Sequence, residues 1–218
     1  MKVLELFAGT RSIGKAFEAH GHEVFSVEWD KRFEKIDLYK DISTLTAEEI
    51  LEKFGHPDVI WASPDCSTYS IAGIHHHRRQ QPNGNLEPIS EYAEFCDKTN
   101  IHVLDLIGEL KPKYWFIENP RGGLRSMWFM KNLPRYTVTY CQYGDTRMKP
   151  TDIWTNHPNP RFKPPCKNGD PCHVSAPRGA STGTQGIKGR IMRAVIPQEL
   201  CEHIVEICEE RMFASMRH

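Results

Sequence analysis

The N-terminal half of the chain alternates between short apolar runs and amphipathic segments, and this alternation restricts the fold more than any other feature. Four apolar runs have the length and alternation of strands: residues 3–7, 22–28, 57–62 and 114–117. Two segments, residues 12–20 and 90–110, follow a helical period, and Thr46 can cap a further helix with Glu49 three residues on. Strands that alternate with helices in this order predict a parallel sheet covered on both faces, an α/β fold.

The bulk composition is that of an ordinary globular protein. Its 218 residues suit one domain with a full core, and 28 Lys+Arg against 28 Asp+Glu give no net basic charge. No apolar run approaches the roughly 20 residues of a membrane span, and the N-terminus lacks the features of a secretory signal. Seven cysteines, an odd number at scattered spacings, do not resemble a disulfide framework. These features predict a reduced, cytoplasmic protein.

Two segments interrupt the strand–helix pattern. Residues 74–88 are polar and rich in turn formers, and we expect a mobile loop there. Residues 156–189 are rich in Pro, Gly, Lys and Ser and have almost no periodicity, which predicts a small irregular insert. The helical pattern returns at residues 197–212.

Chemically useful residues lie at or after the ends of all four predicted strands. The first strand runs into a turn with Gly9, and Glu28 ends the second, where a carboxylate can accept hydrogen bonds from ribose hydroxyls. Cys66 follows the third strand and Glu118 ends the fourth. Taken singly each signal is weak, since a turn glycine, a structural cysteine and a capping carboxylate are all common. In a parallel sheet, however, the carboxyl ends of the strands meet at one edge, where ligands bind.

Taken together, these strings resemble the DNA (cytosine-5) methyltransferase family in order and approximate spacing. The resemblance runs from residue 3 to about residue 207, and the small size is similar to that of phage-encoded members. The matching strings are the glycine turn at 6–10, the acidic motif at 28–30, the Asp motif at 40–42, the Pro-Cys loop at 63–66, the Glu-Asn dipeptide at 118–119, the Arg-containing motif at 142–149 and the closing motif at 193–197.

The resemblance implies a Rossmann-like class I fold that uses S-adenosylmethionine to methylate a flipped cytosine in DNA. It implies a catalytic, cofactor-binding core at residues 1–155, a short target-recognition insert at 156–189 and a C-terminal segment at 190–218 that packs back on the core. The implied catalytic residues are Cys66, Glu118 and Arg147. The implied cofactor-binding residues are Phe7, Ala8, Gly9, Thr10, Glu28, Trp29, Asp41, Ile42 and Pro64.

The chemistry explains why these residue types belong together. Carbon 5 of cytosine is too weak a nucleophile to attack a sulfonium methyl group unless a thiolate first adds at carbon 6, a role for Cys66. A proton on the Glu118 carboxyl can bond N3 and relieve the charge that enters the ring, so we expect a raised pKa for Glu118. Arg147 would bond the base carbonyl. A target base in a duplex must first be flipped out.

The sequence departs from the family pattern at three places. Asp65 stands beside the nucleophile where proline is usual, and Lys149 stands where a second arginine is expected. The insert is also short for a recognition element. These departures leave three hypotheses open: a DNA methyltransferase, the same chemistry on RNA or with a modified cofactor, and a catalytically silent DNA-binding homologue. Protection in restriction–modification and evasion of host restriction both fit the first.

Cysteines gather in the irregular insert. Cys166, Cys172 and His173, with Cys141 or His157 nearby, offer four potential metal ligands. Their spacing lacks a second tight pair and matches no standard zinc signature. The sequence therefore favours free cysteines in a loop and predicts no metal.

Overall fold

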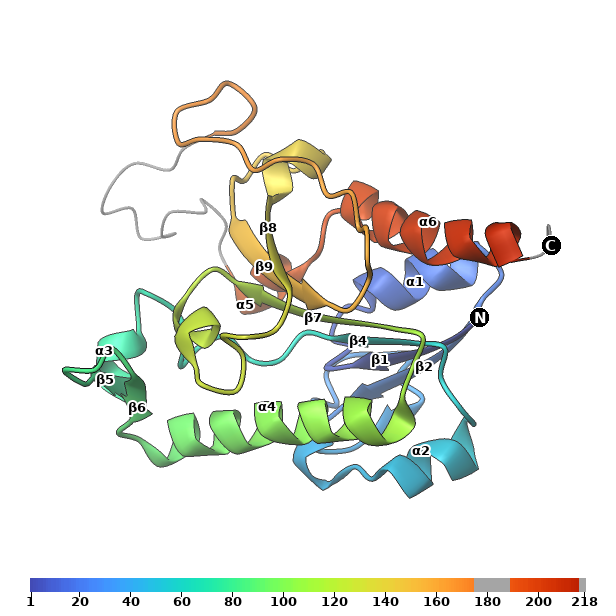
Figure 1. Ribbon diagram of the computed structural model, residues 1–218, viewed down its shortest axis with the longest axis horizontal. Helices are drawn as coiled ribbons and strands as arrows, with labels where there is room; N and C mark the ends of the chain where they lie inside the picture. The colour runs from blue at the N-terminus through green and yellow to red at the C-terminus, as the bar shows by residue number, and fades with distance from the viewer. Residues whose placement is uncertain (175–188, 216–218) are drawn as a thin grey trace.

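A computed structural model describes residues 1–174 and 189–215 and has a seven-stranded sheet at its centre with helices on both faces (Figure 1). The sheet strands are β1 (Lys2–Leu6), β2 (Glu23–Glu28), β3 (Leu38–Tyr39), β4 (Val59–Ala62), β7 (Tyr114–Pro120), β8 (Arg135–Thr139) and β9 (Pro150–Thr155). The α-helices around it are α1 (Ser12–Ala19), α2 (Ala47–Lys53), α4 (Glu91–Leu110), α5 (Arg190–Ala194) and α6 (Gln198–Ser215). Three short 3-10 helices are η1 (Ile42–Thr44), η2 (Gly123–Ser126) and η3 (Tyr140–Tyr143).

The strand order identifies the edge where a ligand would bind. The order is β3-β2-β1-β4-β7-β9-β8, in which the first five strands are parallel and β9 runs antiparallel to both of its neighbours. The chain moves outward from β1 to β3 and then returns to place β4 on the other side of β1. The crevice outside β1 and β4 is thus a topological switch point, the preferred ligand site of an open α/β sheet. The predicted Rossmann-like class I fold is confirmed.

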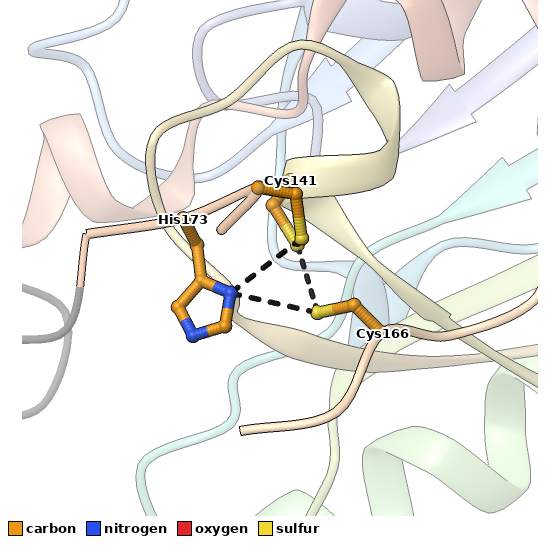
Figure 2. A group of neighbouring side chains, drawn as sticks. Cys141, Cys166 and His173 are labelled. Carbon is orange, nitrogen blue, oxygen red and sulfur yellow. Dashed lines mark hydrogen bonds between the residues drawn. The ribbon is translucent and has the colours of Figure 1, made fainter. Parts of the chain in front are cut away.

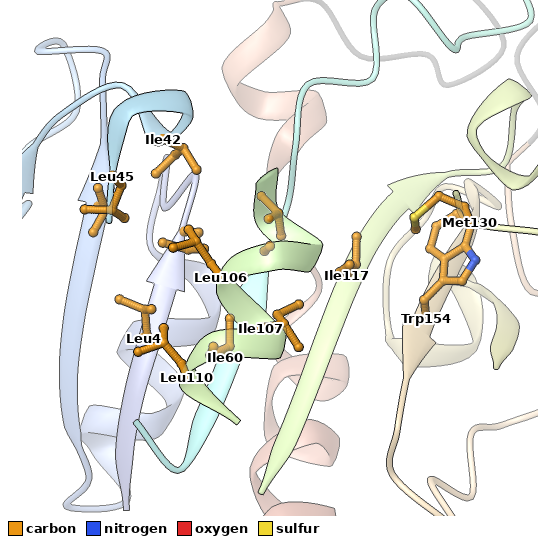
Figure 3. Close-up of a cluster of buried hydrophobic side chains, with 14 of the residues drawn as sticks. Leu4, Ile42, Leu45, Ile60, Leu106, Ile107, Leu110, Ile117, Met130 and Trp154 are labelled. Atoms are coloured by element: carbon orange, nitrogen blue, oxygen red, sulfur yellow. The ribbon is translucent and has the colours of Figure 1, made fainter. Parts of the chain in front are cut away.

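Alternating side chains of the strands build one core on each face of the sheet. Leu4 and Leu6 of β1 point to the face covered by α4, where Leu106 lies among residues such as Ile60 and Ile117 (Figure 3). On the other face, the apolar residues of β1, β4 and β7 pack against α1 and α6, with Phe17 of α1 fully buried. Burial on both faces explains why the parallel strands are continuous apolar runs.

The helix starts predicted from the sequence are confirmed by their caps. The Thr46 hydroxyl accepts a hydrogen bond from the amide of Glu49 at 3.2 Å, and the Ser90 hydroxyl accepts one from the amide of Ala93 at 3.2 Å. Each satisfies an amide that the first turn of its helix leaves without a partner.

Residues 74–88 do not form the irregular loop that the sequence predicted. They form α3 (Ile74–His77) and an antiparallel hairpin of β5 (Arg78–Gln80) and β6 (Leu86–Pro88). An Asn-Gly turn reverses the chain, with Gly84 at φ +83°. Arg78 anchors the hairpin: its fully buried guanidinium forms an ion pair with Asp97 of α4 at 2.7 Å.

The C-terminal helix joins the N-terminal part of the chain. α6 packs beside α1 (Figure 1), and its Glu209 accepts a hydrogen bond from His22 at 2.8 Å. Within the insert, residues 156–174 contain neither helix nor strand, as expected. The predictions for residues 175–188 and 216–218 fall outside the described residues. Among the described residues, no helix is long and apolar enough to cross a bilayer.

Candidate active site

The predicted cofactor turn follows β1 in a strained backbone conformation. Phe7, Gly9 and Arg11 have φ angles of +55°, +50° and +57°. Residues other than glycine rarely adopt this left-handed backbone conformation. Two such residues here therefore indicate a turn that its surroundings hold in place. At Gly9 an added Cβ would meet no atom closer than 3.9 Å, which is ordinary van der Waals contact, so the turn is not crowded at this residue.

Glu28, at the end of β2, holds this turn through its carboxylate. Oε2 accepts a hydrogen bond from the amide of Gly9 at 3.0 Å, and Oε1 accepts two from the amides of Trp29 and Asp30 at 2.9 and 3.0 Å. A carboxylate offers about four acceptor positions, so Oε2 retains one for a ligand hydroxyl. The indole of Trp29 beside it is 64% exposed.

The other predicted cofactor residues have mixed environments. Asp41 is exposed and caps η1 by accepting from the amide of Ser43 at 2.9 Å. Ile42 is only 1% exposed and its side chain belongs to the core, so a ligand there would meet Asp41 first. Ala8 and Pro64 are buried, and Thr10 is half-buried with its hydroxyl 3.0 Å from that of Ser12.

A buried carboxyl group lies beneath the cofactor turn. Glu5 of β1 accepts a hydrogen bond from the amide of Gly14 at 2.9 Å, and Arg11 lies 3.9 Å from its other oxygen. Burial raises the pKa of Glu5 to about 7, against the opposing effects of the Gly14 amide and Arg11. A Cβ added at Gly14 would come within 2.3 Å of the Glu5 carboxylate, so a larger residue there would displace that carboxylate.

The predicted nucleophile Cys66 is half-buried in the loop after β4. The side-chain amide of Asn119 donates a hydrogen bond to the backbone carbonyl of Pro64 at 2.9 Å, which joins this loop to the end of β7. The carboxylate of Asp65 accepts from the amide of Ser67 at 2.6 Å and from its hydroxyl. Asp65 thus caps the turn that follows the cysteine.

The side chain of Glu118, in β7, is buried. The hydroxyl of Tyr140 donates to its Oε1 at 3.3 Å, and Ser63 is a second hydrogen-bond partner. Burial raises the pKa of Glu118, and the charge of Lys149 opposes that shift. The raised pKa expected from the sequence is therefore present, and it favours the protonated carboxyl.

The two cations of the predicted arginine motif have different partners. Arg147 is 5% exposed, and its Nε bonds both carboxylate oxygens of Asp145 at 2.9 Å. It also donates to the carbonyls of Arg193 and Val195, both at 3.3 Å. Lys149 donates to the carbonyl of Arg193 at 2.9 Å and is the positive charge acting on Glu118 and Cys66. Burial lowers the pKa of Lys149, and the charges of Glu118 and Cys66 raise it.

The closing motif at residues 193–197 therefore contacts both halves of the site. Besides the bonds from Arg147 and Lys149, the amide of Ile196 donates to the hydroxyl of Ser12 at 3.3 Å, next to the cofactor turn. The sequence treated Lys149 only as a departure from the family pattern and did not identify Tyr140. Neither spacing nor residue type reveals that Asp145 engages the guanidinium or that a tyrosine faces Glu118.

Comparisons with known proteins identify relatives of the chain. A family model described as C-5 cytosine-specific DNA methylase matches residues 1–127. A "Probable DNA (cytosine-5)-methyltransferase" of Frog virus 3 (isolate Goorha) is 25% identical over 225 residues, covering 95% of this chain and 100% of the viral protein.

Two solved structures share the fold. A DNA modification methyltransferase encoded within an E. coli prophage has a TM-score of 0.53 at 18% identity, covering 71% of this chain and 46% of its own. The methyltransferase EhMeth of Entamoeba histolytica has a TM-score of 0.51 at 13% identity, covering 71% and 52%. The chain thus spans about half the length of these two proteins.

Proposed function

The chain belongs to the C-5 cytosine-specific DNA methylase family, and we propose that it transfers a methyl group to carbon 5 of cytosine in DNA through a covalent adduct with Cys66. The observation that carries this proposal is that a half-buried thiol in the loop after β4 and a buried Glu118 of raised pKa in β7 follow neighbouring strands. The two strands are hydrogen-bonded neighbours, so their carboxyl ends open on the same crevice.

S-adenosylmethionine is the methyl donor of this family, and the residues at the switch point fit it. The uncrowded turn at Gly9 lets a ligand approach the backbone closely, and Oε2 of Glu28 has one acceptor position left for a ribose hydroxyl. The exposed indole of Trp29 offers a flat apolar surface for an adenine ring, with Asp41 beyond it. When bound, the donor supplies an electrophilic methyl group. Phe7, Ala8, Thr10, Ile42 and Pro64 complete the proposed binding site.

Cys66 begins the reaction in this proposal. Its thiolate adds to carbon 6 of the base, and the electrons of the ring double bond move toward carbon 5 and N3. Carbon 5 would then bond the methyl carbon while the bond between that carbon and the sulfonium sulfur breaks, its electron pair staying on the sulfur, which leaves as a neutral thioether. Loss of the carbon 5 proton to water afterwards returns electrons to the ring, breaks the carbon–sulfur bond and releases Cys66 as a thiolate.

Glu118 and Lys149 stabilise the charge that this addition creates. The protonated Glu118 carboxyl donates to N3 of the base, a role that the upward shift of its pKa by burial favours. Tyr140 holds that carboxyl in place through its hydroxyl. The Lys149 ammonium favours the thiolate form of Cys66 by direct attraction.

Arg147 has a positioning role in this mechanism rather than direct contact with the base. Its guanidinium is occupied by Asp145 and by two carbonyls of the closing motif. It therefore fixes the closing motif beside the site, while Lys149 faces the reacting ring. The target base must leave the duplex to reach Cys66 at the crevice, which costs a few kcal/mol.

The test is methylation of mixed-sequence DNA by the purified protein with labelled S-adenosylmethionine, followed by mapping of 5-methylcytosine. We expect methylated cytosine with the native protein and with Cys208→Ala, which changes a buried cysteine of α6. Cys66→Ala should abolish it. DNA containing 5-fluorocytosine should form a stable adduct with the native protein, because fluorine cannot leave as a proton does.

Each alternative gives a different result in the same assay. Methylation of tRNA but not of DNA would assign the chemistry to RNA. DNA binding without transfer would identify a silent homologue, and transfer that persists in Cys66→Ala would refute the covalent mechanism.

A further inference from the structure

Four potential metal ligands converge outside the active site. Cys141 lies in η3 after β8, whereas Cys166, Cys172 and His173 belong to the irregular segment at 156–174. The sulfur atoms and one ring nitrogen all lie within 4.8 Å of one another. Figure 2 shows Cys141, Cys166 and His173 pointing toward a common centre. We propose that these four residues bind a structural zinc ion.

The distances between the ligand atoms fit a tetrahedral site. Zinc–sulfur bonds of about 2.3 Å and zinc–nitrogen bonds of about 2.0 Å require ligand atoms separated by about 3.5–3.8 Å. The Sγ atoms of Cys172 and Cys141 lie 3.6 Å apart, and Nδ1 of His173 lies 3.7 Å from Cys166 and 3.6 Å from Cys172. Only Cys141 and Cys166, with their Sγ atoms 3.0 Å apart, must separate slightly to admit the ion.

The ligand types select zinc among the common metals. Three thiolates and one imidazole form a closed tetrahedral set that leaves no position for water, as in structural zinc sites. Oxygen-preferring ions such as Mg²⁺ and Ca²⁺ find no carboxylate in this cluster. His157, which the sequence offered as an alternative ligand, instead contacts the carbonyl of Ile207 at 2.9 Å. Cys141 is the fourth ligand.

The ion would join the irregular segment to the sheet. Hydrogen bonds already connect that segment to its surroundings: the amide of Cys166 donates to the hydroxyl of Thr139 at 2.9 Å, the amide of Lys163 to the hydroxyl of Tyr143 at 2.8 Å, and the amide of Val174 to the carbonyl of Thr146 at 2.9 Å. Segments without regular structure gain much of their folding free energy from a bound metal. Cys141 and Thr146 flank the start of the loop that carries Arg147, so zinc would also order that loop. The metal site itself does not depend on the proposed methyl transfer.

The test is the zinc content of the native protein, expressed with added zinc, purified without an affinity tag and measured by elemental mass spectrometry. We expect about one zinc ion per chain. Cys172→Ser should lose at least nine-tenths of it, as should Cys166→Ser. Because Cys172 is exposed, its replacement leaves the core intact, and circular dichroism checks that the variant folds. Replacement of zinc by cobalt should give the visible absorption of a tetrahedral thiolate complex.

Two control variants separate this site from other metal-binding groups. Cys66→Ser removes the half-buried thiol of the active site, and the double change His75→Ala and His76→Ala removes exposed imidazoles. Both should keep about one zinc per chain. A native protein without zinc, equal zinc in Cys172→Ser, or a Cys141–Cys166 disulfide found by mass spectrometry would overturn the proposal.

Discussion

The two ends of the central sheet are stabilised by different kinds of interaction. The parallel half, which we define as β1–β4 and β7 with α1, α2 and α4, depends on two apolar cores that the strands and helices build together. The antiparallel end, defined as residues 135–174 with β8, η3 and β9, contains buried polar groups. There Asp152 of β9 is fully buried and pairs with Arg125, and Arg147 pairs with Asp145.

This difference corresponds to a division of tasks. The cofactor turn lies in the parallel half, where strands of the apolar core carry it and the carboxylate of Glu28 binds its Gly9 amide. Lys149, Arg147 and the cysteine cluster lie in the antiparallel end, where charges and thiols must be placed accurately near a substrate. Buried charges cost free energy unless they are paired, which explains the dense polar network at that end.

The largest expected effect is a loss of stability in the parallel half. Leu106 of α4 is 1% exposed, so Leu106→Ala removes contacts and leaves a cavity that costs about 2–5 kcal/mol. Urea unfolding measures this cost. The control Leu51→Ala changes a leucine of α2 that is 46% exposed and should cost much less. Equal losses in both variants would mean that the apolar core does not dominate this half.

The second prediction concerns function at the antiparallel end. Lys149→Met should lower kcat by about 10²–10³-fold, because it removes the charge next to Glu118 and Cys66. Stability should change little, since a buried cation is costly to keep. Lys163→Met is a matched control. The Nζ atom of Lys163 lies 5.0 Å from the centre of the Tyr143 ring, but the side chain is exposed. Single-turnover methylation measures both, and normal turnover in Lys149→Met would remove Lys149 from the mechanism.

The third prediction is a pH dependence inside the parallel half. The pKa of Glu5 rises from 4.5 to about 7 on folding, so the folded state binds this proton more tightly. The resulting stabilisation is fully present below pH 4.5 and is lost as the pH rises to about 7. This contribution to the free energy of unfolding is about 3 kcal/mol, at about 1.36 kcal/mol for each pKa unit.

Glu5→Gln should abolish this dependence, because glutamine does not titrate and can still accept the Gly14 amide. Urea unfolding at several pH values between 5 and 8 measures the slope. Glu18→Gln, which changes the more exposed partner of Arg11, should retain it. A slope that persists in Glu5→Gln would assign the titration to another group.

The contrast between the two ends also explains what the sequence predicts well. Strands of the parallel half are buried on both faces, so each is an apolar run that is visible without knowledge of its neighbours. Strands β8 and β9 were not predicted, because polar residues such as Arg135, Thr137 and Asp152 obscure the alternation of apolar and polar residues that is typical of a strand. Residues 78–88 were expected to form a loop, although the Asn83-Gly84 turn is itself a hairpin signal.

For the site, sequence motifs locate chemical groups but not their partners. Cys66 and Glu118 could be proposed because each follows or ends a recognisable strand. The different environments of Arg147 and Lys149 could not be predicted. They depend on Asp145 and on carbonyl groups that lie more than forty residues away in the sequence. The cysteine cluster was considered, but the sequence left Cys141 and His157 as alternatives and favoured free cysteines, because Cys141 lies 25 residues before Cys166 and only the tertiary fold brings them together.

The packing of α6 against α1 has a consequence for synthesis of the protein. As the chain leaves the ribosome, β1, β2, β4 and β7 can pair and α4 can cover one face of the young sheet. The other face, with Phe17 of α1, lacks the cover of α6 until that helix has also been synthesised. If translation pauses after β7 and before α6, the nascent chain therefore exposes one apolar face of its sheet. Such a face is a binding site for chaperones.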